Sequence, residues 1–280
     1  MIRETKYSQQ GFTLIELSIV LVIIGLLVGG VLVGQDLIKA AEVRATISQV
    51  EKFNTAVNTF RIKFNEIPGD MTQTNAGAFG LLQLTNAAPL GQGDGNGIIE
   101  GGAAGATIPE GETLAFWAHL SQATLIPGQF GTTGNSAITA ATGITAAPVT
   151  IGGLSQSLPP TKLTPTQYFI VYSVSSTNYY QILPVSGITA APAYSFGATG
   201  ITPIAAYNID SKVDDGNPNT GTVVARGIAA VNAAASWTAA TTAANCMMSG
   251  TSNADVSDTY NRVPASGGND PSCSLRFRFQ

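Results

Sequence analysis

Charged side chains are scarce in this chain of 280 residues, since only 11% of the residues are Asp, Glu, Lys or Arg. The net charge is -4 and lysines and arginines are nowhere clustered, which argues against a basic surface that binds nucleic acid. Between Thr113 and Ile209, Lys162 is the single charged side chain if His119 is counted as neutral. This stretch is rich in Thr, Ala, Ser, Gly and Asn. Its composition fits an exported surface protein with many turns and short strands, or a partly mobile loop region.

Sequence motifs that carry catalysis are also missing. The chain has no Gly-x-Ser-x-Gly nucleophile motif, no phosphate-binding loop and no zinc-ligand spacing. His119 is the only histidine, and no Cys, Asp or Glu pattern near it indicates a metal site or a catalytic triad. We therefore expect no enzymatic activity and interpret His119 as a structural or solvent-facing residue.

Only two cysteines occur, Cys246 and Cys273. In an exported chain, an isolated pair of this kind is typical of one disulfide. The bond would close a loop of about 28 residues and contribute roughly 3–4 kcal/mol on the loop-entropy model. The alternative is a pair of buried free thiols, but export, which the N-terminus indicates independently, favours the disulfide.

Apolar residues, by contrast, dominate one long run near the N-terminus. A leader, residues 1–11, carries Arg3 and Lys6, and almost every residue from Phe12 to Val33 is hydrophobic. This run of about 22 residues is long enough to cross a bilayer, and no A-x-A-like site ends it as in a cleaved secretory signal peptide. We therefore expect a retained membrane anchor, with the basic leader in the cytoplasm.

The helix is predicted to continue far beyond the membrane. No proline occurs from Phe12 to Ile67, and Pro68 then stops the helix. The result is one helix of about 53 residues, roughly 80 Å long. Hydrophobic residues at spacings of three and four place an apolar stripe on its second half: Val50, Phe53, Val57, Phe60 and Phe64.

Glycines recur within the apolar part of this helix. Gly25 and Gly29, and again Gly30 and Gly34, have the small-xxx-small spacing that lets helices approach closely. General tolerance of glycine in membrane helices explains them equally well. A third interpretation is that they weaken the helix, so that it can stretch or melt locally during assembly.

The sequence Gly-Phe-Thr-Leu-Ile-Glu-Leu, from Gly11 to Leu17, joins the leader to the apolar run. It resembles the processing site of type IV pilins and type II secretion pseudopilins, with a short leader, a glycine, a phenylalanine and a glutamate as fifth mature residue. The resemblance implies that a prepilin peptidase cleaves after Gly11 and that the new amine of Phe12 is N-methylated. It also implies that Glu16 matters for assembly.

The position of Glu16 has a physical interpretation beside this resemblance. In the first helical turn the helix dipole favours a negative charge. In a stacked filament the carboxylate can pair with the cationic amine of a neighbouring Phe12, which removes an unpaired charge from an apolar bundle. The alternative is a glutamate at the membrane interface, solvated by lipid headgroups, but the complete motif favours the assembly role.

Shorter patterns beyond the long helix predict a mixed head. A helix is expected at 110–124, with Leu114, Trp117, Leu120 and Ala123 facing inward. Alternating or aromatic and β-branched segments predict four strands: 167–174 and 179–183, joined as a hairpin by 175–178, then 222–226 and 275–279.

These elements predict the α+β fold class. A long N-terminal helix, transmembrane and then amphipathic, packs on an antiparallel β-sheet head with long loops. The expected division is a leader at 1–11, a transmembrane half at 12–34, an amphipathic half at 35–67 and a globular head with the C-terminal disulfide region at 68–280.

Two acidic loops are candidate calcium sites, and calcium is the one cofactor that the sequence suggests. Oxygen ligands at alternate positions of a glycine-rich loop can surround a hard cation. The first loop offers Asp94, Asn96 and Glu100, with a carbonyl from Ile98, but it falls short of the EF-hand pattern and a simple Asp/Gly turn is the alternative. The second loop is denser in acids, and its alternative is a solvated turn with Asx hydrogen bonds; it offers Asp210, Asp214, Asp215 and Asn217.

Together these predictions describe a structural subunit of a type IV pilus-like filament. The chain would sit in the bacterial inner membrane as a single-pass protein with its head in the periplasm. After processing it would enter a helical filament, either extracellular or periplasmic. The expected partners are further copies, other pilin-like subunits, the prepilin peptidase and the inner-membrane assembly machinery.

Two alternatives share the same processing motif. One is a pseudopilin of a type II secretion system, although the large head and its long uncharged loops favour a surface filament. The other is a minor tip subunit that acts as a binding or adhesion module. Solvent-exposed aromatic rings among Tyr168, Tyr172, Tyr179 and Tyr180 would support this second alternative.

Overall fold

The computed structural model forms two compact units, Met1–Glu42 and Val43–Gln280. The residues that it describes are 13–83, 93–101, 111–131, 138–139, 143–144, 149–188, 194–197, 200–227, 246–247, 259–262 and 270–279. The predicted leader, the predicted cleavage residue Gly11 and the predicted methylation residue Phe12 lie outside the described residues.

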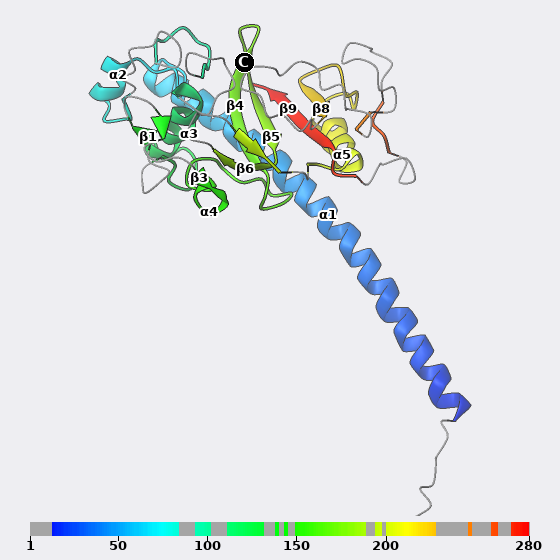
Figure 1. Ribbon diagram of the computed structural model, residues 1–280. Coiled ribbons are helices and arrows are strands. Elements are labelled where there is room, and N and C mark those ends of the chain that lie inside the picture. The colour runs from blue at the N-terminus through cyan, green and yellow to red at the C-terminus, as the bar shows by residue number, and fades with distance from the viewer. Residues whose placement is uncertain are drawn as a thin grey trace, which may run out of the picture. The chain divides into compact units, whose positions relative to one another are not determined.

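The predicted long helix is present as α1, which spans Leu14–Phe64 and contains 51 residues (Figure 1). It ends three residues before Ile67, the predicted last residue, because Asn65 adopts a left-handed conformation with φ 57°. The Asn65 N–H still donates to the Arg61 carbonyl at 2.8 Å, as expected of a helix that ends on a left-handed residue. Asn65, rather than Pro68, is therefore the residue that ends α1.

The amphipathic part of α1 supplies one wall of the head's core. The whole predicted stripe is buried: Val50, Phe53, Val57, Phe60 and Phe64. The ring of Phe53 lies 4.9 Å from the Trp117 ring and 5.2 Å from the Phe169 ring, centroid to centroid. One side chain of α1 thus contacts both a second helix and the sheet, which confirms the prediction that the long helix packs on a sheet.

Two short helices lie near the C-terminal end of α1. The first, α2 (Gln73–Ala78), begins at Thr72, whose hydroxyl accepts a hydrogen bond from the Asn75 N–H. The second, α3 (Glu112–Gln122), occupies the range in which a helix is predicted. The predicted inward residues of α3 are buried, and so is every other residue from Glu112 to Leu120. The helix is therefore enclosed on all sides rather than amphipathic.

His119, on α3, has a structural role. Its Nδ1 atom accepts a hydrogen bond from the Gly69 N–H at 3.0 Å, and its Nε2 atom lies 2.7 Å from the Leu82 carbonyl oxygen. Because Nδ1 accepts, the proton of the neutral ring lies on Nε2. The side chain is fully buried, and burial lowers its pKa to about 4. His119 thus fastens the segment after α1 to α3.

The main sheet has four antiparallel strands in the order β4-β5-β9-β8 (Figure 1). The predicted strands are all present, with bounds β4 (Tyr168–Val174), β5 (Thr177–Leu183), β8 (Val223–Gly227) and β9 (Cys273–Arg278). The C-terminal strand β9 lies inside the sheet, between β5 and β8.

The β4–β5 hairpin turn is tighter than predicted. Val174 pairs with Thr177, so only Ser175 and Ser176 lie in the turn rather than residues 175–178. Both serines have positive φ, 50° and 60°, as a two-residue type I′ turn requires. The turn has two serines in place of the Asn-Gly pair that normally marks such a turn. The prediction therefore placed the start of β5 too late.

The remaining elements are short and were not predicted. The strands β1 (Ile138–Thr139) and β2 (Gly143–Ile144) pair with each other. A three-stranded sheet has the order β3-β6-β7, with bounds Val149–Thr150, Val185–Ile188 and Tyr194–Phe196. The helices are α4 (Ile151–Leu154) and α5 (Pro203–Val213).

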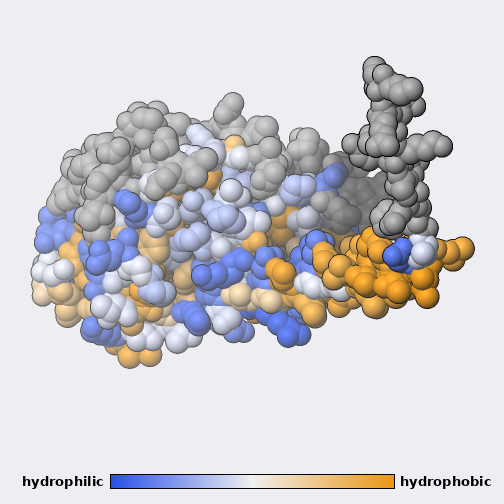
Figure 2. Space-filling model, turned by 90° about the horizontal axis from the view of Figure 1, so that it is seen from below, coloured by the Kyte–Doolittle hydropathy of each residue, from blue (hydrophilic) through white to orange (hydrophobic). Residues whose placement is uncertain are grey.

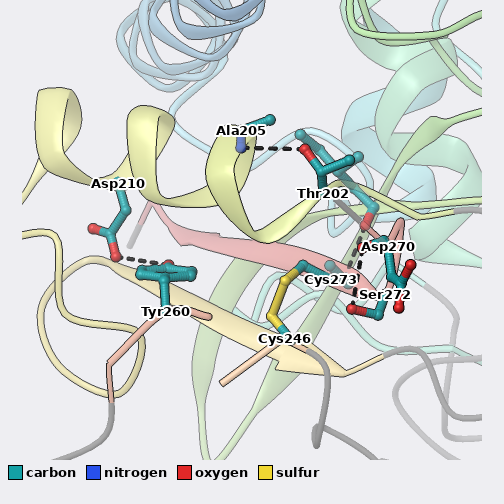
Figure 3. Close-up of a disulfide and its surroundings, with 10 residues drawn as sticks. Thr202, Ala205, Asp210, Cys246, Tyr260, Asp270, Ser272 and Cys273 are labelled. Carbon is teal, nitrogen blue, oxygen red and sulfur yellow. Dashed lines mark hydrogen bonds between the residues drawn. A yellow bond between two sulfur atoms is a disulfide. The ribbon is translucent and has the colours of Figure 1, made fainter. Parts of the chain in front are cut away.

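The predicted disulfide joins Cys246 to Cys273, whose Cα atoms are 5.1 Å apart (Figure 3). Cys273 is the first residue of β9, and Met247, next to Cys246, forms a β-bridge with Tyr260. The bond therefore holds the segment around Cys246 to the interior strand of the main sheet.

The tyrosines of the hairpin do not form an exposed aromatic surface. Tyr168, Tyr172 and Tyr180 are buried. Tyr179 is partly buried, and the Arg276 guanidinium carbon lies 4.2 Å from its ring centroid. Packing within the sheet accounts for these four rings, so they give no support to a binding module.

Candidate functional site

The N-terminal half of α1 carries an exposed apolar surface. Every residue from 13 to 33 is exposed, and α1 is the one helix in the described part of the chain that is long and apolar enough to cross a membrane. Figure 2 shows these side chains as a continuous orange surface. An apolar surface of this extent is stable only against lipid or against other apolar surfaces.

Glu16 closes a capping box at the start of this helix. Its Oε2 atom accepts hydrogen bonds from the Thr13 N–H and the Thr13 hydroxyl, both at 2.8 Å. In return, the Glu16 N–H donates to Thr13 Oγ1 at 3.3 Å. This reciprocal Thr-x-x-Glu arrangement stabilises a helix N-terminus. Among the described residues, none donates a hydrogen bond to Oε1 of Glu16.

The four glycines of the apolar half line open space. A Cβ atom added at Gly25, Gly29, Gly30 or Gly34 would have no neighbour within 4 Å. Their small size is therefore not required by packing within the described chain. The helix-approach, tolerance and local-melting interpretations all agree with this observation.

The segment between α1 and α2 is held in a tight conformation. Gly69 has φ +91°, and a Cβ atom there would lie 2.5 Å from the Glu112 carbonyl oxygen. A side chain at Gly93 would overlap the Met71 carbonyl oxygen. These close approaches bring the end of α1, the glycine-rich loop and the start of α3 together.

An acidic cluster lies where these three segments meet, and we call it the first acidic cluster. Its members are Asp70, Asp94 and Glu112, and one carboxylate oxygen from each lies within 4.8 Å of the others. Asp70 and Glu112 are 1% and 0% exposed, whereas Asp94 is exposed. Of the predicted ligands in this loop, the structure places Asp94 in the cluster.

The other two predicted ligands of this loop bond locally. The Asn96 side chain donates to Asp94 Oδ2 at 3.0 Å and accepts from the Ile98 N–H at 2.7 Å. Glu100 contributes its backbone N–H, which donates to Glu112 Oε2 at 2.8 Å. Its own carboxylate is not a member of the cluster.

Backbone amides fix the loop to its neighbours. The Asp70 carboxylate accepts from the Gly95 N–H at 2.9 Å and from the Gly97 N–H at 2.6 Å. Asn178, on β5, accepts from the Ile99 N–H and donates to the Gly97 carbonyl, both at 2.9 Å. The carboxylates of the cluster are thus held in position rather than loosely exposed.

Burial and mutual repulsion disfavour the charged forms in this cluster. Burial raises the pKa of Glu112 to about 10, and the nearby carboxylates of Asp70 and Asp94 act in the same direction. Burial likewise raises the pKa of Asp70 to about 7, against the lowering effect of the two amide hydrogen bonds. The site therefore attracts positive charge, either as protons or as a cation.

The second acidic cluster, Asp210, Asp214 and Asp215, lies at the C-terminal end of α5. Asp210 is buried, and its Oδ2 atom accepts from the Tyr260 hydroxyl at 2.8 Å (Figure 3). Burial raises the pKa of Asp210 to about 7.

The exposed side of this second cluster is occupied by turn hydrogen bonds. Asp214 accepts from the Thr222 and Val223 amides. Asp215 accepts from the Thr220 hydroxyl at 2.6 Å and from the amide of Asn217, the fourth predicted ligand, at 2.8 Å. These bonds correspond to the solvated Asx turn that the sequence offers as the alternative to calcium.

Comparison with known proteins identifies the N-terminal segment. Residues 6–32 match the family model of the prokaryotic N-terminal methylation motif. This segment is therefore similar to the N-terminal segment of type IV pilins and pseudopilins. The motif and the exposed apolar helix that follows it support membrane anchoring of the chain. The chain matches no curated protein and no solved structure.

Three residues of these sites were not singled out from the sequence. Thr13 could have been found, because Thr-x-x-Glu before an apolar run is the pattern of a capping box. Asp70 and Glu112 could not, because only the folded chain brings the end of α1 next to α3.

Proposed function

We propose that this pilin-like chain is a subunit of a type IV pilus-like filament, assembled through the apolar half of α1. The observation that carries the proposal is the methylation motif at residues 6–32 at the start of a helix whose residues 13–33 are all exposed. A prepilin peptidase would cleave after Gly11, and the new amine of Phe12 would be methylated.

The exposed apolar surface supports the two stages of this proposal. In the inner membrane, lipid covers it, and the head lies on the periplasmic side. Once the helix leaves the bilayer, the same helices of neighbouring subunits must cover it, because each Å² of apolar surface left in water costs about 25 cal/mol. The proposed filament therefore needs partner subunits whose N-terminal helices are similarly apolar.

The Oε1 atom of Glu16 supports a register contact between subunits. Thr13 donates only to Oε2, and no described residue donates to Oε1. A neighbour's Phe12 amine can therefore add to the capping box without breaking it. Such a pairing removes both charges from water together and would favour one stagger of the helices.

The proposal is tested by blocking the processing step with Gly11→Val. We expect sheared surface filaments of wild-type cells to contain the chain with methylated Phe12 as its first residue, by mass spectrometry. The Gly11→Val chain should remain full-length in the membrane and be absent from filaments. Gln10→Val, a matched change one residue earlier, should be processed normally.

Two results would contradict the proposal. If the Gly11→Val chain were recovered in sheared filaments at the wild-type level, processing would not be required for assembly. A processed wild-type chain that never reaches surface filaments would instead indicate a pseudopilin of a secretion system.

A further inference from the structure

We propose that Asp70, Asp94 and Glu112 bind a Ca²⁺ ion that joins the end of α1, the loop 93–101 and the start of α3. The proposal concerns the head alone and does not depend on which filament the chain builds.

The arrangement of charge in the first acidic cluster attracts a positive partner. Three carboxylates, two of them buried, lie within 4.8 Å of one another. A buried carboxylate takes up a proton, pairs with a cation or coordinates a metal, because an isolated buried charge is costly. None of the three forms an ion pair with a lysine or arginine in the described part of the chain.

A second, independent observation points to a ligand. Oε1 of Glu112 is buried and has no hydrogen-bond partner, while Oε2 already accepts from the Glu100 N–H. The loop amides of Gly95 and Gly97 donate to Asp70. A cation between the three carboxylates would pair with this oxygen.

The donor set and its spacing favour Ca²⁺. The donors are oxygens alone, which suits hard cations. Ca²⁺ binds its oxygen ligands at about 2.3–2.6 Å in flexible geometry, whereas Mg²⁺ demands near-ideal octahedral geometry and usually keeps several waters. The three carboxylate oxygens lie within a 4.8 Å span, which a Ca²⁺ shell accommodates.

The second acidic cluster is the weaker candidate. Asp215 is exposed there, and both of its oxygens accept hydrogen bonds within the turn. Tyr260 donates to Asp210 Oδ2, while Asp210 Oδ1 is buried without a hydrogen-bond partner, as Glu112 Oε1 is. In the first cluster, by contrast, the ligands come from three separate segments that the ion would hold together.

The test compares ion binding and thermal stability of the full chain in detergent micelles. We expect 1 mM CaCl₂ to raise the midpoint of thermal unfolding by about 5 °C or more over EDTA, and titration calorimetry to show one strong Ca²⁺ site. An equal concentration of MgCl₂ should have a much smaller effect. Asp94→Asn, at an exposed position, should weaken Ca²⁺ binding at least about ten-fold, and Glu112→Gln should do the same.

Two matched variants serve as controls. Glu100→Gln changes a neighbouring carboxylate outside the cluster, and Asp215→Asn changes the second cluster; both should keep the wild-type response. Unchanged unfolding of the wild-type chain in Ca²⁺ would overturn the proposal, as would an equal shift with Mg²⁺. A response that survives Asp94→Asn and Glu112→Gln but is lost in Asp215→Asn would also overturn it, because the ion would then bind at α5.

Discussion

Glu16 combines a role inside the chain with one that we propose between chains. Inside the chain, its Oε2 atom and Thr13 cap the start of α1. The capping bonds need an acceptor but no charge, since Gln also closes a capping box. The proposed contact with a neighbour's amine needs the charge. The two roles are therefore separable by substitution.

The buried side chain of His119 makes the stability of the head sensitive to acid. Both ring nitrogens are engaged, with Nδ1 accepting from Gly69 and Nε2 facing the Leu82 carbonyl. Protonation of Nδ1 would break the bond to Gly69. The folded pKa of about 4 lies below the ordinary value of 6.5. The unfolded chain therefore binds more protons, and this stability is lost as the pH falls below 6.5.

We predict that His119→Asn, which cannot titrate, loses less stability than the wild type on acidification. Between pH 7.5 and pH 5.5 the wild type should lose about 1 kcal/mol more free energy of unfolding than the variant. Urea unfolding of both chains in detergent measures this difference. The carboxylates of Asp70 and Glu112, whose raised pKa values act in the opposite direction, are present in both chains and cancel. If the free energy of unfolding depended on pH equally in the two chains, the proposed role of His119 in acid sensitivity would be contradicted.

At the scale of elements, the helix α1 and the main sheet were predictable because their signals are local. Val50, Phe53 and Val57 recur with helical spacing, and the stripe to which they belong is buried as expected. The alternation at 275–279 likewise predicts β9. The short strands β1, β2 and β3 gave no such signal, because two-residue strands show no period.

The helix α5 was missed although its start is marked. Thr202 caps it by accepting from the Ala205 N–H, and Pro203 occupies the first turn. This Thr-Pro pair is a recognisable start signal. The apolar spacing that follows is weak, because small and polar residues interrupt the buried face, so the pattern alone did not indicate a helix.

The β4–β5 turn allows a prediction at the level of one element. Ser175 and Ser176 both hold a left-handed conformation that costs about 1 kcal/mol or more for a residue with a Cβ atom. The double substitution Ser175→Asn and Ser176→Gly should relieve this cost and raise the midpoint of thermal unfolding by roughly 2–4 °C. Ser176→Ala, which keeps the Cβ atom, is the matched control and should give no gain. Loss of stability in the Asn-Gly variant would contradict the turn geometry.

For the whole molecule, the Cys246–Cys273 bond could be predicted from composition, whereas the meeting of Asp70 with Glu112 could not. The cysteine pair follows from there being only two cysteines in an exported chain. The first acidic cluster depends on the close approach of three segments around Gly69 and Gly93, which no single stretch of sequence encodes. Its ligand set therefore emerges only from the fold.

Assembly is the property of the whole molecule on which the proposed function rests. Residues 13–33 of α1 present an exposed apolar surface, and residues 6–32, which include its start, match the methylation motif. Helix packing would supply the free energy of association, and the Glu16 charge would set the register. The central claim is that the charge of Glu16 acts between subunits and not only within its own helix.

The most direct test compares Glu16→Gln with Thr13→Ala in cells. Glu16→Gln keeps the capping box and removes the charge, whereas Thr13→Ala weakens the cap and keeps the charge. The measurement is the amount of chain in sheared filaments relative to the total processed chain. We predict at least a ten-fold loss, roughly 1.4 kcal/mol or more, for Glu16→Gln and little loss for Thr13→Ala. Wild-type filament levels in Glu16→Gln, or an equal loss in both variants, would contradict the account.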